Sequence, residues 1–301
     1  MTSPDIKKGP DFICIGAMKA GTTWLYEQLK QHPEVWLPPV KQINYFDEKE
    51  EGLSDHWYSK IFSRKEKYRR LRWRFKNRLY LSYKSGNWKH LRWDVRYFLG
   101  KRNDAWYRKL FLPEGNRISG DVTPDYSALS EETVNSIAKA YPHVKILLIL
   151  RNPAERLWSH LRMVLGDVEL QENTSNIDVW KRAIERASAF GNYHDIIERW
   201  SKAFGKDRFH IYYYDDLALQ PDVLLNRICA DLNIAPMPKD IDLTRVFNKG
   251  DERMPPGKLR AMISEHCRAV LDQLVPLELP GKNIIQQWRS DNEPANTSSH
   301  E

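Results

Sequence analysis

The sequence predicts an α/β fold in which helices flank a central, mostly parallel sheet. Residues 144–150, VKILLIL, are almost continuously apolar, which is typical of a strand covered on both faces of a parallel sheet. Residues 12–16, FICIG, and 209–217, FHIYYYDDL, indicate two further strands. Because segments with helical periodicity lie between these strands, they indicate parallel pairing through helical crossovers and a three-layer arrangement.

The expected strands 12–16 and 144–150 are each followed, after a short loop, by an expected helix. The first helix covers 22–31, where Leu25 and Leu29 share one face. Pro153 marks the start of the helix after the strand 144–150, because proline is favoured in the first helical turn. The other expected elements are a strand end with a turn at 118–129 and helices at 130–140, 193–204, 221–232 and 255–274, the first of them capped by Ser130.

Length and composition favour a single domain over residues 1–301, with a flexible polar tail at 289–301. Hydrophobic residues make up 41% of the 301 residues, enough for a sizeable core. The three cysteines form no CxxC pair, so we expect neither a disulfide framework nor a zinc site. There is no apolar signal core and no run near the roughly 18–20 residues of a spanning helix. We therefore expect a cytoplasmic protein.

Positive charge is concentrated in one aromatic-rich insertion, residues 52–105. The net charge is +7, but residues 60–102 alone carry +14 and the remainder −7. Leu71, Phe75 and Leu79 fall at helical spacing within it. The insertion is either a solvated basic face packed onto the domain by its aromatic residues, or a lid over an acceptor. As a lid it would suit an acidic glycan, an anionic lipid head group or the inner membrane surface. No nucleic-acid recognition module is visible.

A glycine-containing loop follows the first strand, in MKAGTTWL (18–25). Strand, glycine loop and helix form the arrangement with which proteins cradle phosphate. In the P-loop pattern the lysine follows the last glycine, whereas Lys19 precedes Gly21 by two residues. The loop therefore predicts an anion site of a different kind.

A second loop follows the strand 144–150, in LILRNPAERLWS. It provides Arg151 and, two turns into the next helix, Ser159. Because ligands of parallel sheets bind beyond the carboxyl ends of the strands, both loops lie on one rim. Two anion sites on one rim indicate a ligand with two separated anionic groups.

These motifs resemble those of sulfotransferases that use 3′-phosphoadenosine 5′-phosphosulfate (PAPS). The family has a strand followed by Lys-x-Gly-Thr-Thr, and a second strand followed by Arg-Asn-Pro with a serine eight residues after the arginine. The similarity extends to HPEVWLPPVKQINYFD, WYRKLF, GDVTPDYSAL and FHIYYYDDL, and it is closest to the bacterial and Golgi glycan-type branch. The resemblance implies a P-loop-like fold. It also indicates a bacterial protein, because the Golgi members carry membrane anchors that are not seen here.

The resemblance implies where the donor binds. Backbone N–H groups and a lysine would stabilise charge on the transferred sulfuryl group, an arginine would hold the 3′-phosphate, and no metal is needed. The implied donor-binding residues are Lys19, Ala20, Gly21, Thr22, Thr23 and Trp24 at the phosphosulfate, Arg151 and Ser159 at the 3′-phosphate, and Lys249 and Gly250 in the late loop NKGDERMPPG.

The general base is not determined by the sequence. In the glycan branch a glutamate stands where KQINYFD has Gln42, and an amide accepts no proton at neutral pH. Asp47, His160 or Asp121 could replace it; water could take the proton while Gln42 orients the acceptor; or the protein binds nucleotide without transferring anything. We expect Gln42, Asn44 and Asp121 to contact the acceptor, although Asp121 beside Thr-Pro is equally typical of a turn.

The sequence therefore predicts transfer of a sulfuryl group from PAPS to a hydroxyl or amine of a glycan, a lipid head group or a small molecule. Lys19 would stabilise the leaving phosphate. Two alternatives stay open, a P-loop-like kinase that uses ATP and a non-catalytic nucleotide-binding adapter that docks to membranes through residues 60–102. The acceptor and the oligomeric state are not predicted.

Overall fold

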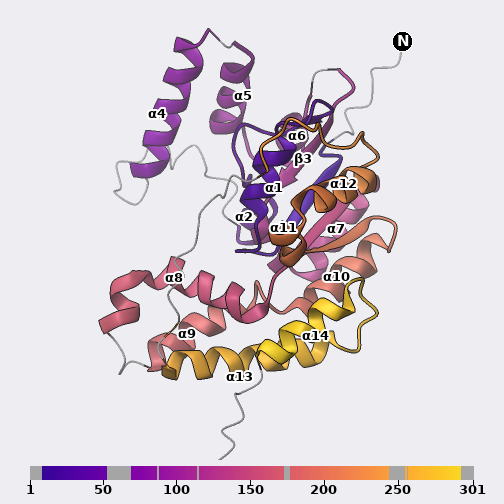
Figure 1. The fold of residues 1–301 in the computed structure, drawn as a ribbon. Coiled ribbons are helices and arrows are strands. Elements are labelled where there is room, and N and C mark those ends of the chain that lie inside the picture. Colours follow the sequence, from indigo (N-terminus) through magenta and orange to yellow (C-terminus); the bar gives the residue numbers. More distant parts are fainter. Residues whose placement is uncertain are drawn as a thin grey trace, which may run out of the picture.

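A five-stranded parallel sheet forms the centre of the molecule, in the order β2-β3-β1-β4-β5 (Figure 1). The computed structural model describes residues 9–52, 69–86, 88–113, 115–172, 177–243, 255 and 257–292. The strands are β1 (Phe12–Gly16), β2 (Val35–Trp36), β3 (Ile118–Val122), β4 (Lys145–Leu150) and β5 (Phe209–Tyr213). This confirms the predicted α/β fold with a parallel sheet flanked by helices.

The chain changes direction across the sheet at β1. It runs from β1 to β2 and β3 on one side, and later returns to β4 and β5 on the other. β1 pairs with β3 through Phe12 and Gly120, and with β4 through Ile13 and Ile146. A switch of this kind opens a crevice beyond the carboxyl ends of the flanking strands. The fold therefore places a ligand site next to the ends of β1 and β4.

The central strands are fully enclosed. Every residue of β4 from Ile146 to Leu150 has 0% exposure, as predicted from its continuous apolar character. Burying one such side chain contributes about 1.5–3 kcal/mol to stability. The rim residues that follow β1 and β4 are therefore attached to the most rigid part of the domain.

Helices α7 (Glu131–Ala140) and α10 (Tyr193–Phe204) pack together, and α10 lies against β4 and β5. The Ser130 hydroxyl accepts a hydrogen bond from the Thr133 N–H at 3.3 Å and caps α7, as predicted. Other helices near the sheet are α1 (Thr22–Leu29), α2 (Phe46–Glu50), α6 (Asp104–Lys109), α12 (Pro221–Leu232) and the 3₁₀ helix η3 (Pro124–Ala128).

A second hydrophobic cluster lies outside the sheet, where α8 packs on α9 and α13 (Figure 1). Trp180 of α9 is fully buried there beside Leu161 of α8 and Leu259 of α13. The bounds are α8 (Pro153–Glu172), α9 (Ile177–Ser188), α13 (Gly257–Leu274) and α14 (Lys282–Asp291). α14 extends into the expected tail, whose residues 293–301 lie outside the described part.

The strand predicted at 209–217 is too long. β5 ends at Tyr213, and Tyr214–Leu219 form helix α11. Asp215 and Asp216 lie in the first turn of α11, where carboxylates interact favourably with the helix dipole. The Trp288 indole also donates a hydrogen bond of 3.0 Å to Asp215. These interactions outweigh the strand propensity of the preceding tyrosines.

The basic insertion contains two helices, α4 (Arg69–Lys84) and α5 (Trp88–Leu99), which pair and project from the body (Figure 1). We call them the basic hairpin. Asp94 of α5 is fully buried and accepts hydrogen bonds from Arg78 at 2.8 Å and from Ser82 at 2.8 Å. Arg78 also donates to the Pro39 carbonyl at 3.2 Å, which ties the hairpin to the body. The expected helix is thus present, and residues 53–68 lie outside the described part.

Candidate active site

The loop after β1 leaves backbone N–H groups available at the start of α1. Its first intrahelical hydrogen bond runs from the Leu25 N–H to the Gly21 carbonyl, so the N–H groups of the three preceding residues lie free of the helical ladder. The first turn of α1 contains no acidic residue. The positive end of the helix and its N–H groups therefore face the rim without a competing carboxylate.

The backbone of this loop requires its glycine. Gly21 has φ of 83°, and a Cβ there would lie 2.7 Å from Leu217 Cδ1 of α11. Lys19 also has a positive φ, 71°, which is uncommon for a residue with a side chain. Strained backbone of this kind is typical of binding sites, where the surrounding structure holds it in place.

The loop after β4 lies directly beside the loop after β1. Arg151 Nη1 donates a hydrogen bond of 3.1 Å to the Lys19 carbonyl. The buried Tyr193 hydroxyl accepts from the Arg151 N–H at 3.2 Å and donates to the Arg151 carbonyl at 2.9 Å. The Tyr214 ring lies 4.4 Å from the guanidinium carbon. The structure thus brings Lys19 and Arg151 together at one site and holds the arginine on two sides.

Positive charge is concentrated around the Lys19 ammonium. Burial lowers the pKa of Lys19, and the charges of Arg162 and Arg151 lower it further. Its Nζ lies 4.0 Å from the Met163 sulfur. Ser159 is half-buried one helical turn before Met163 on the same face of α8, so it faces the same region. Because nearby like charges disfavour the ammonium, an anion bound here would relieve their repulsion.

The Arg151 guanidinium is engaged with a carboxylate in this structure. Its Nε and Nη2 donate to Glu155 Oε2 at 3.1 and 2.9 Å. Glu155 is 56% exposed, and exposed pairs of this kind contribute little to stability. A bound phosphate could therefore take the place of Glu155.

Lys41 adds a further cation beside the donor loop. Its Nζ donates hydrogen bonds to the hydroxyls of Thr23 at 2.9 Å and Thr22 at 3.3 Å. Burial is the largest cause of its lowered pKa. These bonds place the segment that contains Gln42 and Asn44 next to the predicted donor site.

That segment is also strained. Gln42 and Asn44 have φ of 63° and 51°, so three of the four non-glycine residues with positive φ in the described ranges are predicted site residues. Gln42 Nε2 donates to Asp125 Oδ2 at 2.9 Å, and Asn44 Nδ2 donates to Asp47 Oδ2 at 2.7 Å. Both amides thus hold carboxylates at the rim.

The two aspartates named as base candidates have different surroundings. Asp121 is 1% exposed, and its oxygens accept hydrogen bonds from Thr123 at 2.7 Å and Tyr107 at 2.8 Å, while burial raises its pKa to about 6. Asp47 is half-buried, its Oδ1 has no partner in the described part of the chain, and burial followed by the charge of Asp125 raises its pKa. Contact of either carboxylate with an acceptor stays a prediction.

His160 lies inside α8, packed 5.6 Å from the Phe190 ring. Burial, with smaller contributions from Arg156 and Lys19, lowers the pKa of His160 to about 4. Its Nδ1 is buried and has no hydrogen-bond partner among the described residues. The ring is therefore neutral at pH 7, but it is a weak base.

The segment that precedes the late loop in the sequence lies beside α1. Trp24 Nε1 donates to the Leu243 carbonyl at 3.4 Å, and Gln28 Nε2 donates to the Asp242 carbonyl at 3.3 Å. Lys249 and Gly250 themselves lie outside the described residues. Trp24 is buried and its indole contacts Leu243, so its predicted contact with a donor stays a prediction.

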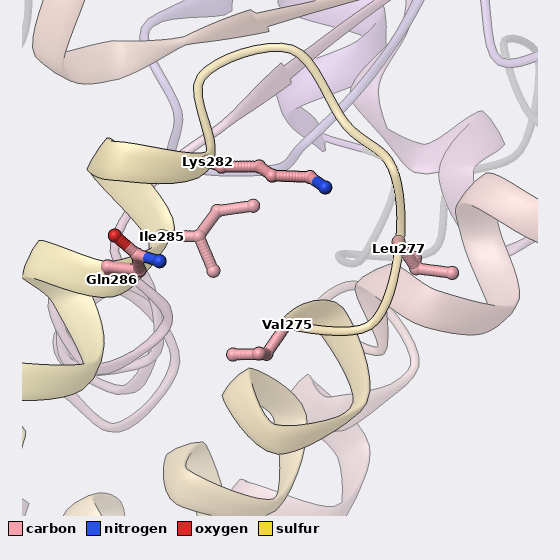
Figure 2. Close-up of a pocket in the computed structure, with 5 residues that line it drawn as sticks. All are labelled: Val275, Leu277, Lys282, Ile285 and Gln286. Atoms are coloured by element: carbon pink, nitrogen blue, oxygen red, sulfur yellow. The ribbon is translucent and has the colours of Figure 1, made fainter.

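Other features of the described residues lie apart from these contacts. His194, Asp195 and Glu198 of α10 have ligand atoms within 4.8 Å of one another, but the two carboxylates are exposed. Figure 2 shows a small pocket between α13 and α14, lined by Val275, Leu277, Lys282, Ile285 and Gln286, none of them a predicted site residue. That no metal takes part stays a prediction.

Sequence reasoning missed four side chains that shape this site, namely Tyr193, Tyr214, Arg162 and Asp125. Arg162 lies in α8, the helix that follows Arg151, so a count of cations after the strand 144–150 would have found it. Tyr193 and Tyr214 come from α10 and α11, and nothing local in the sequence connects them with Arg151.

Comparison with known proteins decides the family. A family model described as "Sulfotransferase family" matches residues 10–238, which contain the whole sheet and both rim loops. The chain belongs to the sulfotransferase family. Its parallel sheet and the loops after β1 and β4 are therefore those of a sulfotransferase.

The sulfotransferase is 24% identical over 245 residues to the heparan sulfate glucosamine 3-O-sulfotransferase 5 of Homo sapiens, with 77% of this chain and 55% of that protein covered. It is 22% identical over 211 residues to the bifunctional heparan sulfate N-deacetylase/N-sulfotransferase 1 of Caenorhabditis elegans, with 62% and 24% covered. The chain thus spans about half of the first relative and about a quarter of the second.

A solved sulfotransferase from Alicyclobacillus acidocaldarius has a TM-score of 0.58 with this structure at 21% identity. The match covers 93% of this chain and 98% of that one. At this identity the likeness supports the fold.

Proposed function

We propose that the protein transfers the sulfuryl group of PAPS to a hydroxyl or amine and releases adenosine 3′,5′-bisphosphate. The observation that carries the proposal is the contact between Arg151 and the Lys19 carbonyl. It joins two cationic loops at the switch point of the sheet, where one nucleotide with two separated anionic groups can reach both.

Each loop has a role in this proposal. Lys19 and the N–H groups at the start of α1 stabilise the charge that builds on the leaving phosphate. Arg151, with its fixed fork of donors, and Ser159 hold the 3′-phosphate. Lys41 orients the hydroxyls of Thr22 and Thr23 toward the same anion. The chemistry is direct displacement at sulfur, which requires position and charge rather than a covalent intermediate.

Ligand-induced stabilisation separates this proposal from the ATP-dependent kinase. A ligand that binds only the native state at 100 times its Kd stabilises it by about 2.7 kcal/mol. We expect adenosine 3′,5′-bisphosphate to raise the Tm, and ATP to raise it much less. A shift with ATP alone would support the kinase instead.

Arg151→Ala tests the assignment of the 3′-phosphate. Loss of charge-assisted hydrogen bonds should weaken bisphosphate binding by about 10- to 100-fold. Adenosine 5′-monophosphate, which has no 3′-phosphate, should bind wild type and variant almost equally in isothermal titration calorimetry. Equal losses for both ligands would contradict the assignment.

The basic hairpin carries a concentration of cations. α4 contains seven Lys and Arg and no acidic residue. Trp73, Tyr83 and Trp88 are each more than 60% exposed beside these cations. Such a surface fits an anionic acceptor, and two relatives are named for heparan sulfate. We propose an anionic, hydroxyl- or amine-bearing acceptor, of which a glycan of the heparan type is the first to test.

The acceptor test uses radiolabelled PAPS. We expect label to transfer to an unsulfated heparan-type polymer faster than to an uncharged disaccharide, and faster at low than at high salt, because salt screens the cations of the hairpin. Membrane binding with no consumption of donor, whichever glycan, lipid or small-molecule acceptor is offered, would support the non-catalytic adapter.

The same exposed aromatics favour a contact with the inner membrane surface. In the described part of the chain, no helix has the length and apolar character to cross a bilayer. Lys and Arg beside Trp and Tyr suit the interface of an anionic bilayer. We propose a cytoplasmic protein that docks peripherally through the basic hairpin.

Vesicle sedimentation tests the docking. We expect the protein to pellet with phosphatidylglycerol vesicles and not with phosphatidylcholine vesicles. Trp73→Ala with Trp88→Ala should reduce the pelleted fraction, while Leu219→Ala, at an 80% exposed apolar side chain of α11, should not. Equal pelleting of all variants would place the contact elsewhere.

A further inference from the structure

Transfer to a hydroxyl requires a base on the acceptor side of the sulfur. The new bond joins the acceptor oxygen to sulfur, and the bond from sulfur to the bridging phosphate oxygen breaks. The electron pair of the broken bond leaves with the bisphosphate, and the acceptor O–H proton must go to a nearby group. This inference rests on the proposed sulfuryl transfer.

Asp125 lies in a turn that contacts the end of β1. It belongs to η3, the 3₁₀ turn that follows β3. A Cβ on Gly16, the last residue of β1, would lie 3.2 Å from Ser127 Cβ and 3.4 Å from the Pro124 carbonyl oxygen. η3 therefore covers the end of β1.

Gln42 holds one oxygen of this carboxylate. Its Nε2 donates to Asp125 Oδ2 at 2.9 Å, and its backbone N–H donates to the Val122 carbonyl at 3.2 Å. Asp125 is half-buried, and its Oδ1 has no hydrogen-bond partner in the described residues. One oxygen is thus fixed and the other is left to accept a proton.

The Asp125–Gln42 pair is connected to the loop after β1 through Lys41, the residue before Gln42. Lys41 reaches the Thr23 hydroxyl at 2.9 Å while Gln42 reaches Asp125. Two consecutive side chains therefore link the predicted sulfuryl site with the carboxylate. An acceptor between them would meet the donor on one side and Asp125 on the other.

The other candidate bases are less suited. Asp121 is enclosed and both of its oxygens accept hydrogen bonds. The free oxygen of Asp47 is buried. His160 lies inside α8, with its Nδ1 buried. We propose that Asp125 is the catalytic base, and that Gln42 positions it by donating a hydrogen bond.

The Asp125–Gln42 pair also explains why an amide suits position 42. Two carboxylates at hydrogen-bond distance repel each other, and one of them would be protonated near neutral pH. An amide and a carboxylate share one charge and one hydrogen bond. The pair could therefore be inverted, with Glu at 42 and Asn at 125, without changing its charge or its length.

The experiment compares Asp125→Asn, the double variant Asp125→Asn with Gln42→Glu, and Asp178→Asn, an exposed control on α9. Initial rates are measured with radiolabelled PAPS and whichever acceptor of the panel wild type uses best, and bisphosphate Kd and Tm are measured for each protein. We expect Asp125→Asn to lower kcat by about 10²- to 10⁴-fold, the range that general base catalysis contributes. Its bisphosphate Kd should stay close to that of wild type.

The double variant should recover a large part of the lost kcat, because it restores a carboxylate within the same hydrogen-bonded pair. The single variant Gln42→Glu is measured beside them, because a glutamate at 42 could act as a base on its own. A purely structural role for Asp125 predicts a lower Tm for Asp125→Asn, and no more activity in the double variant than this new carboxylate accounts for. An Asp125→Asn variant that keeps wild-type kcat, or a folded double variant as slow as Asp125→Asn, overturns the inference. A wild-type protein that transfers label to no acceptor overturns the proposed function, and this inference with it.

Discussion

The donor rim and the basic hairpin are built in opposite ways. At the rim, strands with fully buried side chains end in loops whose backbone is held in uncommon conformations, at Lys19, Gly21 and Gln42. In the hairpin, α4 exposes Trp73 and Tyr83 beside its cations. The difference indicates that the fold itself forms the proposed donor site, whereas the basic hairpin, the proposed acceptor surface, is an attached element.

A buried carboxylate joins the two helices of the hairpin. Asp94 has 0% exposure and accepts from Arg78 and Ser82 of α4, while Trp93 of α5 donates its indole N–H to the Leu110 carbonyl at 3.0 Å. Phe75 and Phe98 pack at 5.2 Å between the two helices. The hairpin can therefore be loosened at one position without touching the rim.

The largest expected effect removes the rim cation. Lys19→Ala should lower kcat by about 10²- to 10³-fold, as the loss of one preorganised charge at a developing anion does. The Tm should change little, because burial among like charges already disfavours this ammonium. Initial rates with labelled PAPS measure it, with the exposed Lys139→Ala of α7 as the control. Equal rates in wild type and Lys19→Ala would remove the lysine from the chemistry.

The second prediction separates the two regions. Asp94→Ala should lower the free energy of unfolding by about 3 kcal/mol, because it leaves Arg78 without its buried partner. Bisphosphate Kd should not change, since the rim does not depend on this contact. Urea unfolding and calorimetry measure the two quantities.

The control for Asp94→Ala is Lys49→Ala at the exposed pair with Asp104, where both side chains are about half exposed. Exposed pairs contribute roughly 0–1 kcal/mol, so this variant should unfold almost as wild type does. A large change in bisphosphate affinity for Asp94→Ala would show that the hairpin and the rim are coupled.

The third prediction concerns acid. The neutral form of His160 is favoured in the folded protein, with a pKa of about 4 against about 6.5 when unfolded. As the pH falls from 6.5 to 4, the unfolded state binds the proton first, so stability is lost across this window. The free energy of unfolding should therefore fall by about 2–3 kcal/mol less between pH 7 and pH 4 in His160→Gln than in wild type. Chemical unfolding at pH 7 and pH 4 measures it, and parallel loss in both proteins would contradict it.

The sequence was sufficient where a local pattern determined structure. The apolar run of β4, the Ser130 cap and Pro153 at the start of α8 are set by neighbouring residues. The pairing of Gln42 with Asp125 and of Arg151 with Tyr193 depends on strand order, which brings distant segments together. The sequence does not indicate that Tyr214 lies in a helix, because aromatic residues favour strands. The helix dipole and the hydrogen bond from Trp288 to Asp215 compete with that preference.

The smallest expected effect sharpens the description of the rim itself. Glu155, in the first turn of α8, accepts a hydrogen bond of 2.9 Å from Arg151 Nη2. A pair of this kind at i,i+4 contributes about 0.3–0.5 kcal/mol, so Glu155→Gln should tighten bisphosphate binding by only about twofold. The gain should vanish for adenosine 5′-monophosphate, because it lacks the group that competes with Glu155. Weaker bisphosphate binding in Glu155→Gln would mean that the carboxylate orients the guanidinium for the phosphate instead of competing with it.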